Sequence, residues 1–100
     1  MANTFKVLYR GAASTSSTTL YTVPASTTTL VTSFVIANTA STAATYSITM
    51  NSVDVAKDAI VAGNDSLVIE FKQLLDASQI LAGEASDTSV NFSVSGLEIS

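Results

Sequence analysis

The segment TLVTSFVIAN, residues 29–38, decides the fold class of this chain. Its residues alternate between two sets with a period of two, which is typical of a β-strand and not of a helix. One set is Leu30, Thr32, Phe34 and Ile36, and the other is Val31, Ser33, Val35 and Ala37. Both sets contain large apolar residues, so the segment predicts a central strand or a strand that faces a partner. Leu30, Val31 and Val35 are therefore candidates for core or interface positions.

The same alternation recurs on both sides of this segment. The expected strands lie around residues 5–10, 20–23, 45–50, 53–61, 66–71, 80–85 and 89–99. Residues 54–61 read as an interrupted strand, and Gln73, Leu74 and Leu75 as the one place for a short helical turn. We therefore expect one all-β domain spanning residues 1–100. Its seven or eight short antiparallel strands would form a single β-sandwich with jelly-roll or immunoglobulin-like connections. Asn51 and Ser52 predict a tight turn.

The last expected strand changes phase near its end. Val90, Phe92 and Val94 are apolar at even positions, whereas Leu97 and Ile99 are apolar at odd positions. A β-bulge at Gly96, with a positive φ that glycine tolerates, would return both sets to one face. The alternative is a strand that changes sheets there.

Composition restricts the classes of function. Charged residues make up 12% of the chain, about half of the ~25% that is usual. The formal net charge is −4 and only four residues are basic. A groove that neutralises phosphates is therefore not expected, and neither is nucleic-acid binding. Serine and threonine supply a polar, uncharged surface, which is suited to close packing against other protein.

The chain lacks the residues of the common catalytic sites. It has no histidine and no cysteine, so neither a Ser-His-Asp nor a Cys-His nucleophile is available. Its four glycines form no phosphate-binding loop. The carboxylates fall mostly in turns or on outward strand positions, where they are expected to be solvated. We predict no enzymatic activity, no cofactor and no metal, the alternative being a calcium site at Asn64 and Asp65.

The three tyrosines, Tyr9, Tyr21 and Tyr46, would form a sugar-binding platform if they were exposed together. Tyr46 shares the phase of Ile48 and Met50, which predicts a core position, and Tyr9 shares the phase of Phe5 and Val7. Tyr21 is then the tyrosine expected to be free, and it joins Leu30, Val31 and Val35 as an interface candidate. No signal peptide or membrane-spanning segment is recognisable, so we expect synthesis and assembly in a cytoplasm and no membrane partner.

Four stretches carry a resemblance to a known group of proteins. They are Leu20-Tyr21-Thr22-Val23-Pro24-Ala25, Val35-Ile36-Ala37-Asn38-Thr39, Ala43-Ala44-Thr45-Tyr46-Ser47-Ile48 and the ending from Val90 to Ile99. In these the chain resembles small bacteriophage virion proteins over most of its length from Leu20 onward. It departs from them at Ser26 and at Ala77-Ser78, where the group often has Gly and Gly-Asp. The resemblance implies a virion structural protein more firmly than it implies head or tail.

The expected function follows from this resemblance together with the absence of catalytic residues. We expect a capsid decoration or cement protein, located in the virion, that binds the major capsid protein or another virion protein. A homo-oligomer is expected, with a trimer favoured, and residues 1–19 could form a partly extended arm. The alternatives are a tail, baseplate or fibre component, including a host-surface carbohydrate-binding module, and a pilus-like or adhesion subunit.

Overall fold

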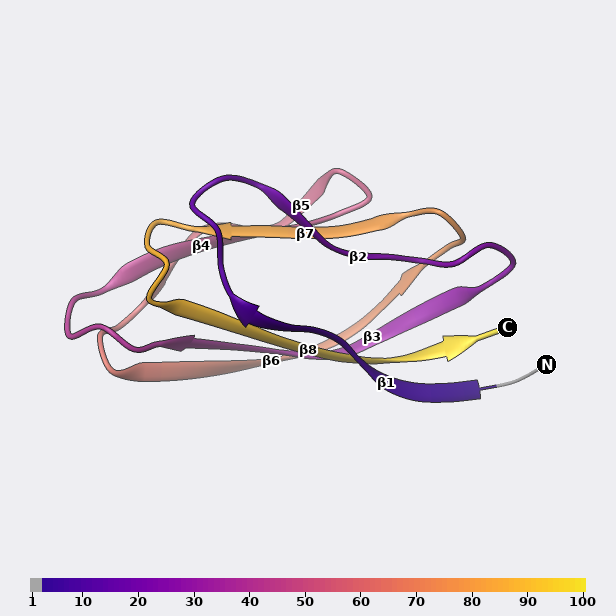
Figure 1. Cartoon of the computed structure of the whole chain (residues 1–100), viewed down its shortest axis with the longest axis horizontal. Helices are drawn as coiled ribbons and strands as arrows, with labels where there is room; N and C mark the ends of the chain where they lie inside the picture. The colour runs from indigo at the N-terminus through magenta and orange to yellow at the C-terminus, as the bar shows by residue number, and fades with distance from the viewer. Residues whose placement is uncertain (1–2) are drawn as a thin grey trace.

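Two antiparallel β-sheets pack face to face in the computed structural model, which describes residues 3–100 apart from the side chain of Phe71 (Figure 1). The strands of this described part are β1 (Asn3–Ala12), β2 (Thr18–Thr22), β3 (Thr28–Asn38), β4 (Ala44–Met50), β5 (Val53–Val61), β6 (Asp65–Leu75), β7 (Ile80–Ala85) and β8 (Val90–Ile99). Sheet A has the order β1-β8-β3-β6, and sheet B has the order β2-β7-β4-β5. The all-β sandwich predicted from the alternating sequence is confirmed.

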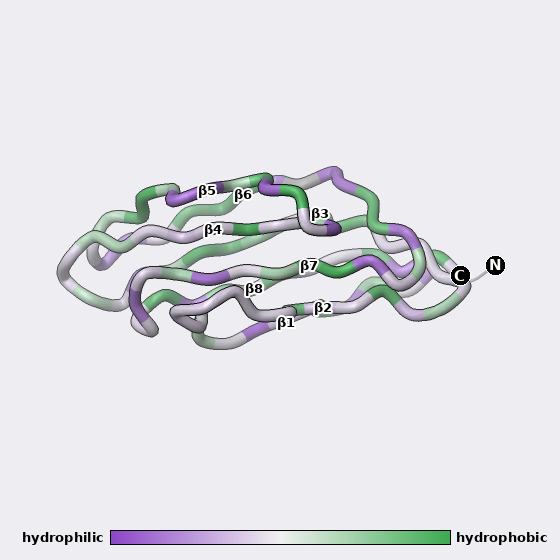
Figure 2. Tube along the Cα trace, turned by 90° about the horizontal axis from the view of Figure 1, so that it is seen from above, coloured by the Kyte–Doolittle hydropathy of each residue, from purple (hydrophilic) through white to green (hydrophobic). Residues whose placement is uncertain are grey.

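The strand order identifies the connections. The first four strands pair with the last four, β1 with β8, β2 with β7, β3 with β6 and β4 with β5. The chain therefore resembles one long hairpin rolled into two sheets, and the β3–β8 and β4–β7 pairs close the roll. Seen from above, each strand of sheet B lies over its chain neighbour in sheet A (Figure 2). This order is that of a jelly roll, which selects the first of the two predicted topologies.

The tip of the rolled hairpin is the predicted tight turn between β4 and β5. Asn51 and Ser52 have φ angles of 50° and 64°. Two successive positive φ values are the signature of a type I′ turn, whose twist matches that of the flanking strands. Asparagine tolerates this region well, whereas serine is strained in it.

The core lies between the sheets and consists of the inward-facing residues of both. Phe34 of β3 and Phe92 of β8 are almost fully buried, and their rings meet edge to face at 5.0 Å, a favourable aromatic geometry. Val31 is also fully buried among these residues. Of the interface candidates, Val31 is thus a core residue and does not reach the surface of the single chain.

A β-bulge at Thr32 interrupts the alternation of β3. Val31 pairs with Gly96 and Ser33 with Ser95, so β3 has one extra residue relative to β8 at this point. Thr29 and Val31 face the core before the bulge, whereas Phe34 and Ile36 face it afterwards. The interpretation that placed Leu30 and Thr32 on one face with Phe34 is therefore wrong, because the bulge shifts the phase by one residue.

The predicted bulge at Gly96 is also misplaced. The residues Val90, Phe92, Val94 and Gly96 are all buried, so β8 keeps one phase through the glycine. The register shifts lie on its two neighbours, between Val7 and Tyr9 in β1 and between Val31 and Ser33 in β3. None of the four glycines, all of which are described, has a positive φ. Leu97 therefore faces outward and Glu98 inward.

Gly96 is required for a different reason. An added Cβ would lie 2.7 Å from the backbone oxygen of Leu30 and 2.8 Å from Cδ1 of Leu8. Both distances are well inside ordinary van der Waals contact. The absence of a side chain at this position allows β3 and the bulged part of β1 to approach β8 closely.

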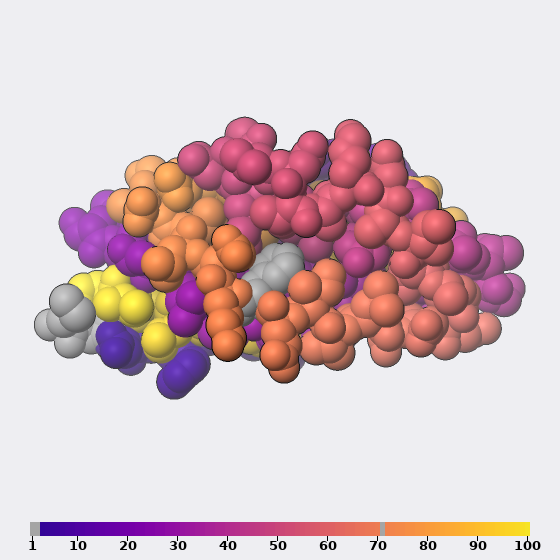
Figure 3. Space-filling model, turned by 180° about the vertical axis from the view of Figure 1, so that it is seen from behind, coloured from indigo at the N-terminus to yellow at the C-terminus, as the bar shows by residue number. Residues whose placement is uncertain are grey.

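Strands β5 and β6 form one long side of the sandwich (Figure 3). The interrupted strand predicted for residues 54–61 is confirmed, since β5 has two register shifts against β4. Asp58 has a φ of 48°, and its amide donates a hydrogen bond of 3.0 Å to Oγ of Ser47. The helical turn predicted at Gln73 to Leu75 is wrong, because those residues complete β6.

The N-terminal segment is part of the sandwich. Residues 3–12 form β1 and pair with β8 along their length, and β2 begins at Thr18. The extended arm predicted for residues 1–19 is therefore wrong for residues 3–19, whereas Met1 and Ala2 lie outside the described residues. Both ends of the described chain lie at the same end of the molecule (Figure 1).

Candidate functional site

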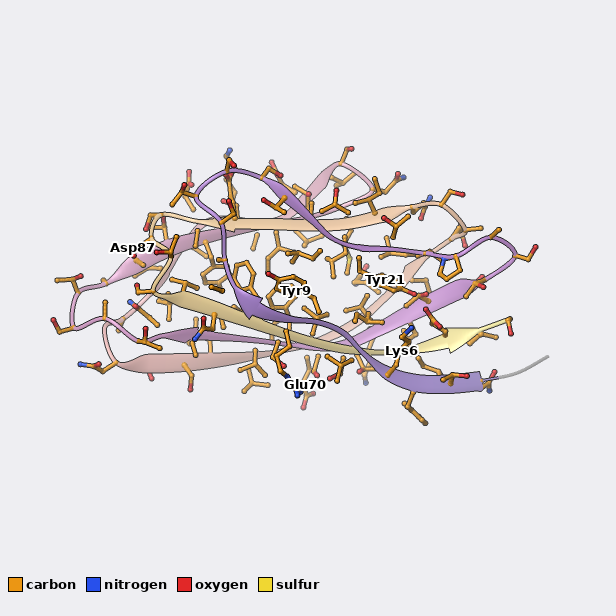
Figure 4. The ribbon with its side chains drawn as sticks, viewed as in Figure 1. Lys6, Tyr9, Tyr21, Glu70 and Asp87 are labelled. Atoms are coloured by element: carbon orange, nitrogen blue, oxygen red, sulfur yellow. The ribbon has the colours of Figure 1, made fainter. Side chains whose placement is uncertain are left out.

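A polar cluster joins the two sheets near the chain termini. Glu98 of β8 points inward because Gly96, two residues earlier, faces the core. Its carboxylate accepts a short hydrogen bond from the hydroxyl of Tyr21 in β2, and it lies 3.6 Å from Nζ of Lys6 in β1. The phenol has one proton to donate, so Thr29 of β3 donates to the Tyr21 oxygen at 2.9 Å. These interactions tie four strands together at one end, and Figure 4 shows two members of the cluster, Lys6 and Tyr21.

This cluster changes the role expected for Tyr21. Burial, together with the hydrogen bond to Glu98 and the charge of Glu98, raises the pKa of the Tyr21 phenol to about 12, while the hydrogen bond with Thr29 acts in the opposite direction. A phenol with a raised pKa that donates to a carboxylate remains a neutral donor at physiological pH. The prediction that Tyr21 is free is wrong, because its hydroxyl belongs to the internal network and its ring is half-buried against the core.

The three tyrosines do not form a shared sugar-binding platform. Tyr46 is buried, as its phase predicted, and burial raises the pKa of its phenol. Tyr9 is half-buried, and its hydroxyl donates a 2.9 Å bond to the carbonyl of Ala12. The bulge in β1 separates Tyr9 from Phe5 and Val7, which are exposed.

The acidic side chains are dispersed over the surface. Among the described side chains, no three acidic groups gather closely enough to hold a metal ion. At the candidate calcium turn, Asp65 accepts a bond from the Ser66 amide at 2.9 Å, and Asn64 has a φ of 52°. These are ordinary turn interactions. Asp58 and Glu84 both line a shallow hollow of about 160 Å³ on the outer face of sheet B, which is also lined by Thr15 and Ser47.

The outer face of sheet A carries a row of apolar side chains that crosses the whole sheet. Phe5 pairs with Leu97, Leu97 with Leu30, and Leu30 with Leu74. These residues belong to β1, β8, β3 and β6 in turn, and each faces away from the core. Phe5 is 81% exposed and Leu74 63% exposed, while Leu30 and Leu97 between them are half-buried. We call these four residues the apolar row.

Further apolar residues flank the apolar row on the same face. Ile99 is two residues from Leu97 on β8, and Val7 is two residues from Phe5 on β1. Val35 and Val68 pair with each other on β3 and β6. A shallow depression of about 310 Å³ follows, between Arg10, Val35 and Ser93. The apolar surface is therefore continuous across the sheet and not a set of isolated residues.

The outer face of sheet B has a different character. Its outward residues on β4 are Thr45, Ser47 and Thr49, and Thr49 lies in one row with Ala82 of β7 and Thr19 of β2. The sandwich thus has one hydroxyl-rich face and one face with an apolar row. A water-exposed sheet normally alternates apolar residues inward with polar residues outward. Sheet B follows this rule along β4 and exposes apolar residues only on β5 and at the start of β7, whereas in sheet A an apolar row crosses all four strands.

The structure brings some of the sequence candidates together and separates others. Leu30 is part of the apolar row and Val35 lies beside it, whereas Val31 is in the core and Tyr21 lies between the sheets. Sequence reasoning missed Phe5, Leu74 and Leu97 as surface residues. The odd position of Leu97 in the sequence is the signal for its outward direction, because β8 keeps one phase through Gly96.

Comparison of the chain with family models, with curated proteins and with solved structures finds no match. The described residues also contain no helix that is long and apolar enough to cross a membrane.

Proposed function

We propose that this chain is a non-enzymatic structural subunit of a bacteriophage virion, and that it acts as a decoration or cement protein on the capsid. The observation that carries this proposal is the apolar row on the outer face of sheet A. A continuous apolar surface on a small domain marks an interface with protein. A cement protein needs such a surface and needs no catalytic group.

Two further features support a structural role. The jelly roll is an architecture that viral capsid proteins use repeatedly, although fold alone does not define function. The connections between strands are short, and the loop of residues 62–64 packs tightly against the loop near Ser41. The exposed surface of such a domain is formed mainly by the outer faces of its two sheets and less by loops. Broad, regular faces of this kind suit repeated packing against a lattice of capsid subunits.

The proposal is tested by locating and removing the protein. Antibody against the chain is bound to intact particles, which are examined by negative-stain electron microscopy, and particles lacking the protein are heated in parallel. Label spread over the head, together with heads that open at lower temperature when the protein is absent, is the expected result. Particles without label would contradict a virion role.

A second candidate is a tail, baseplate or fibre component that binds a host-surface carbohydrate. The hollow on sheet B favours it, because Asp58, Glu84, Thr15 and Ser47 offer the carboxylates and hydroxyls that bind sugar hydroxyls. Jelly rolls also occur among lectins. Label confined to the tail, with loss of infectivity but intact heads after depletion, would select this candidate over the cement protein.

A further inference from the structure

We propose that the outer face of sheet A is a self-association surface, on which two copies of this chain pack face to face about a twofold axis parallel to the strands. The proposal deepens the proposed function and rests on it in one respect, since a virion subunit is present in many copies at high local concentration. It assigns the protein interface of the apolar row to a second copy of the subunit, so that the pair contacts the capsid through its other surfaces. Three properties of the face select a second copy as its occupant.

The first property is that the apolar row is complementary to itself. A twofold axis parallel to the strands places β1 of one copy over β6 of the other, and β8 over β3. Phe5 then lies over Leu74 of the second copy, and Leu97 lies over Leu30. Phe5 and Leu74, at the two ends of the row, are strongly exposed, whereas Leu97 and Leu30, at its centre, are half-buried. Each projecting side chain therefore meets another apolar side chain of the same row.

The second property is the charge of the two edges. Strand β1 places Arg10 on the outer face of sheet A, whereas Lys6 points inward to Glu98, and no acidic residue lies within residues 3–12; β6 places Glu70 on the same face. Glu70 points outward from sheet A (Figure 4). The twofold axis lays the basic edge of each copy over the acidic edge of the other, so the edges attract twice per pair.

Arg10 and Glu70 are the pair that this arrangement brings closest. Arg10 lies in the row of Val35 and Val68, so it faces Val68 of the second copy. Glu70 is two residues further along β6, about 7 Å away, which is within the reach of an arginine side chain. The Arg10 guanidinium is exposed, and its Nε donates to Oγ of Ser93 at 3.1 Å, which leaves its other N–H groups for a carboxylate.

The third property is size. The molecule measures 45 × 22 × 18 Å along its principal axes, and the sheets stack along the 22 Å direction (Figure 1). The outer face of a sheet is therefore 45 × 18 Å, about 810 Å² in projection. A face of this extent is large enough to bury an area on the order of the ~800 Å² per partner of a standard-size interface.

The same properties disfavour the trimer expected from the sequence. A threefold ring requires two different surfaces that fit each other, whereas a twofold pair requires one surface that fits itself. The remaining exposed apolar residues of the described chain are Val53, Val55 and Ile60 of β5 and Ile80 of β7. Strand β4, whose outward residues are polar, separates these two strands, so the four residues form no second row across a sheet.

The proposal is tested by measuring the mass of the purified full chain by multi-angle light scattering and sedimentation equilibrium. We expect a species of twice 10.3 kDa that dissociates on dilution. Leu74→Glu should weaken the pair by about tenfold or more, since it places a carboxylate against the apolar row. Ile60→Glu is the matched control, because Ile60 is 71% exposed, lies on sheet B and should leave the mass unchanged. A monomer or a trimer at all concentrations would overturn the proposal.

A charge-exchange experiment tests the orientation of the pair. Arg10→Glu and Glu70→Arg should each weaken association, and the double variant should restore it, because both contacts are then re-formed with the charges exchanged. Additive weakening in the double variant would contradict the placement of β1 over β6. Circular dichroism and thermal unfolding of each variant verify that the sandwich is intact.

The two proposals fail in different ways. A twofold pair in solution, with no labelled particles, would remove the virion role and leave the self-association surface standing. Labelled particles, with a chain that stays monomeric when purified, would remove the self-association surface and leave the virion role standing.

Discussion

Replacing Gly96 with alanine tests the close approach of three strands at the bulges of sheet A. The new Cβ would lie 2.7 Å from the backbone oxygen of Leu30 and 2.8 Å from Cδ1 of Leu8. An ordinary carbon–oxygen contact needs about 3.3–3.6 Å, so β3 or β8 must move by roughly 0.7 Å. The Leu8 side chain can rotate, but the Leu30 oxygen belongs to the backbone of a central strand.

The expected loss of stability follows from this clash. Overpacking a rigid site costs about 1–3 kcal/mol, and alanine recovers about 0.4–1 kcal/mol by restricting the unfolded chain. Because the Leu30 oxygen is backbone, the upper half of the overpacking range, about 2–3 kcal/mol, applies. The net loss is then about 1–2.5 kcal/mol, which corresponds to a decrease in Tm of about 4–20 °C for a domain of this size. Gly96→Val should cost more, because its branched side chain meets the same backbone oxygen.

The assay is thermal and urea unfolding followed by circular dichroism. Gly11→Ala is the matched control in sheet A, because the nearest atom to its new Cβ is the hydroxyl oxygen of Tyr9, at 3.2 Å, on a side chain that can move. We expect Gly11→Ala to change stability by less than about 0.5 kcal/mol. The reasoning would be refuted if Gly96→Ala unfolded at the temperature of the wild-type protein or above it.

Four other predictions address the turns, the polar cluster and the edge of sheet A. Gly63→Ala should lower stability strongly, because its Cβ would lie 2.2 Å from the Ser41 backbone oxygen; an unchanged urea midpoint would argue against this packing. Ser52→Gly should raise Tm, since glycine is favoured at the second central position of a type I′ turn, and a lower Tm would contradict that turn. The raised pKa of Tyr21 means that its stabilising contribution is complete below pH 10 and is lost as the pH rises through about 12. An ultraviolet titration of Tyr21→Phe should therefore lack the step near pH 12, and an unaltered titration would exclude the assignment. In hydrogen exchange, the amides of β1 should exchange before those of β3, because Leu8 is the one buried side chain of residues 3–12; equal protection would contradict this order.

Local patterns in the sequence were sufficient to predict the sandwich. The alternation around Tyr46 and Ile48 depends only on which face of a strand meets the core, and the structure confirms it. The tight turn at Asn51 and Ser52 is also local, because it depends on which residues tolerate positive φ.

The bulges could not be assigned to their strands from the sequence. The phase change at Gly96 was a real signal, but a bulge is a mismatch between two strands, and either strand can hold the extra residue. Here the extra residues are Leu8 in β1 and Thr32 in β3, which lie far from Gly96 in the chain. Knowing which strand pairs with which is necessary before the phase can be interpreted.

The candidate interface was predicted only at Leu30 and Val35. The apolar row combines Phe5, Leu97, Leu30 and Leu74, which are contributed by four strands from both ends and the middle of the chain. Its continuity depends on the register of three strand pairs. Leu74 was also assigned to a helical turn, since a short apolar run of two leucines does not distinguish a strand from a helix.

The central claim is that the outer face of sheet A is covered by protein in the assembled particle. It is tested most directly by the reactivity of single introduced thiols. The chain has no cysteine, so Leu74→Cys and Ile60→Cys each introduce one thiol, at positions of similar exposure on opposite sheets. Both variants are labelled with a maleimide as dilute chain and within intact particles. We predict that both react in the dilute chain, and that in particles Leu74→Cys is protected while Ile60→Cys still reacts. Equal reactivity of Leu74→Cys in the two states would show that the outer face of sheet A stays open to water, and would contradict the account.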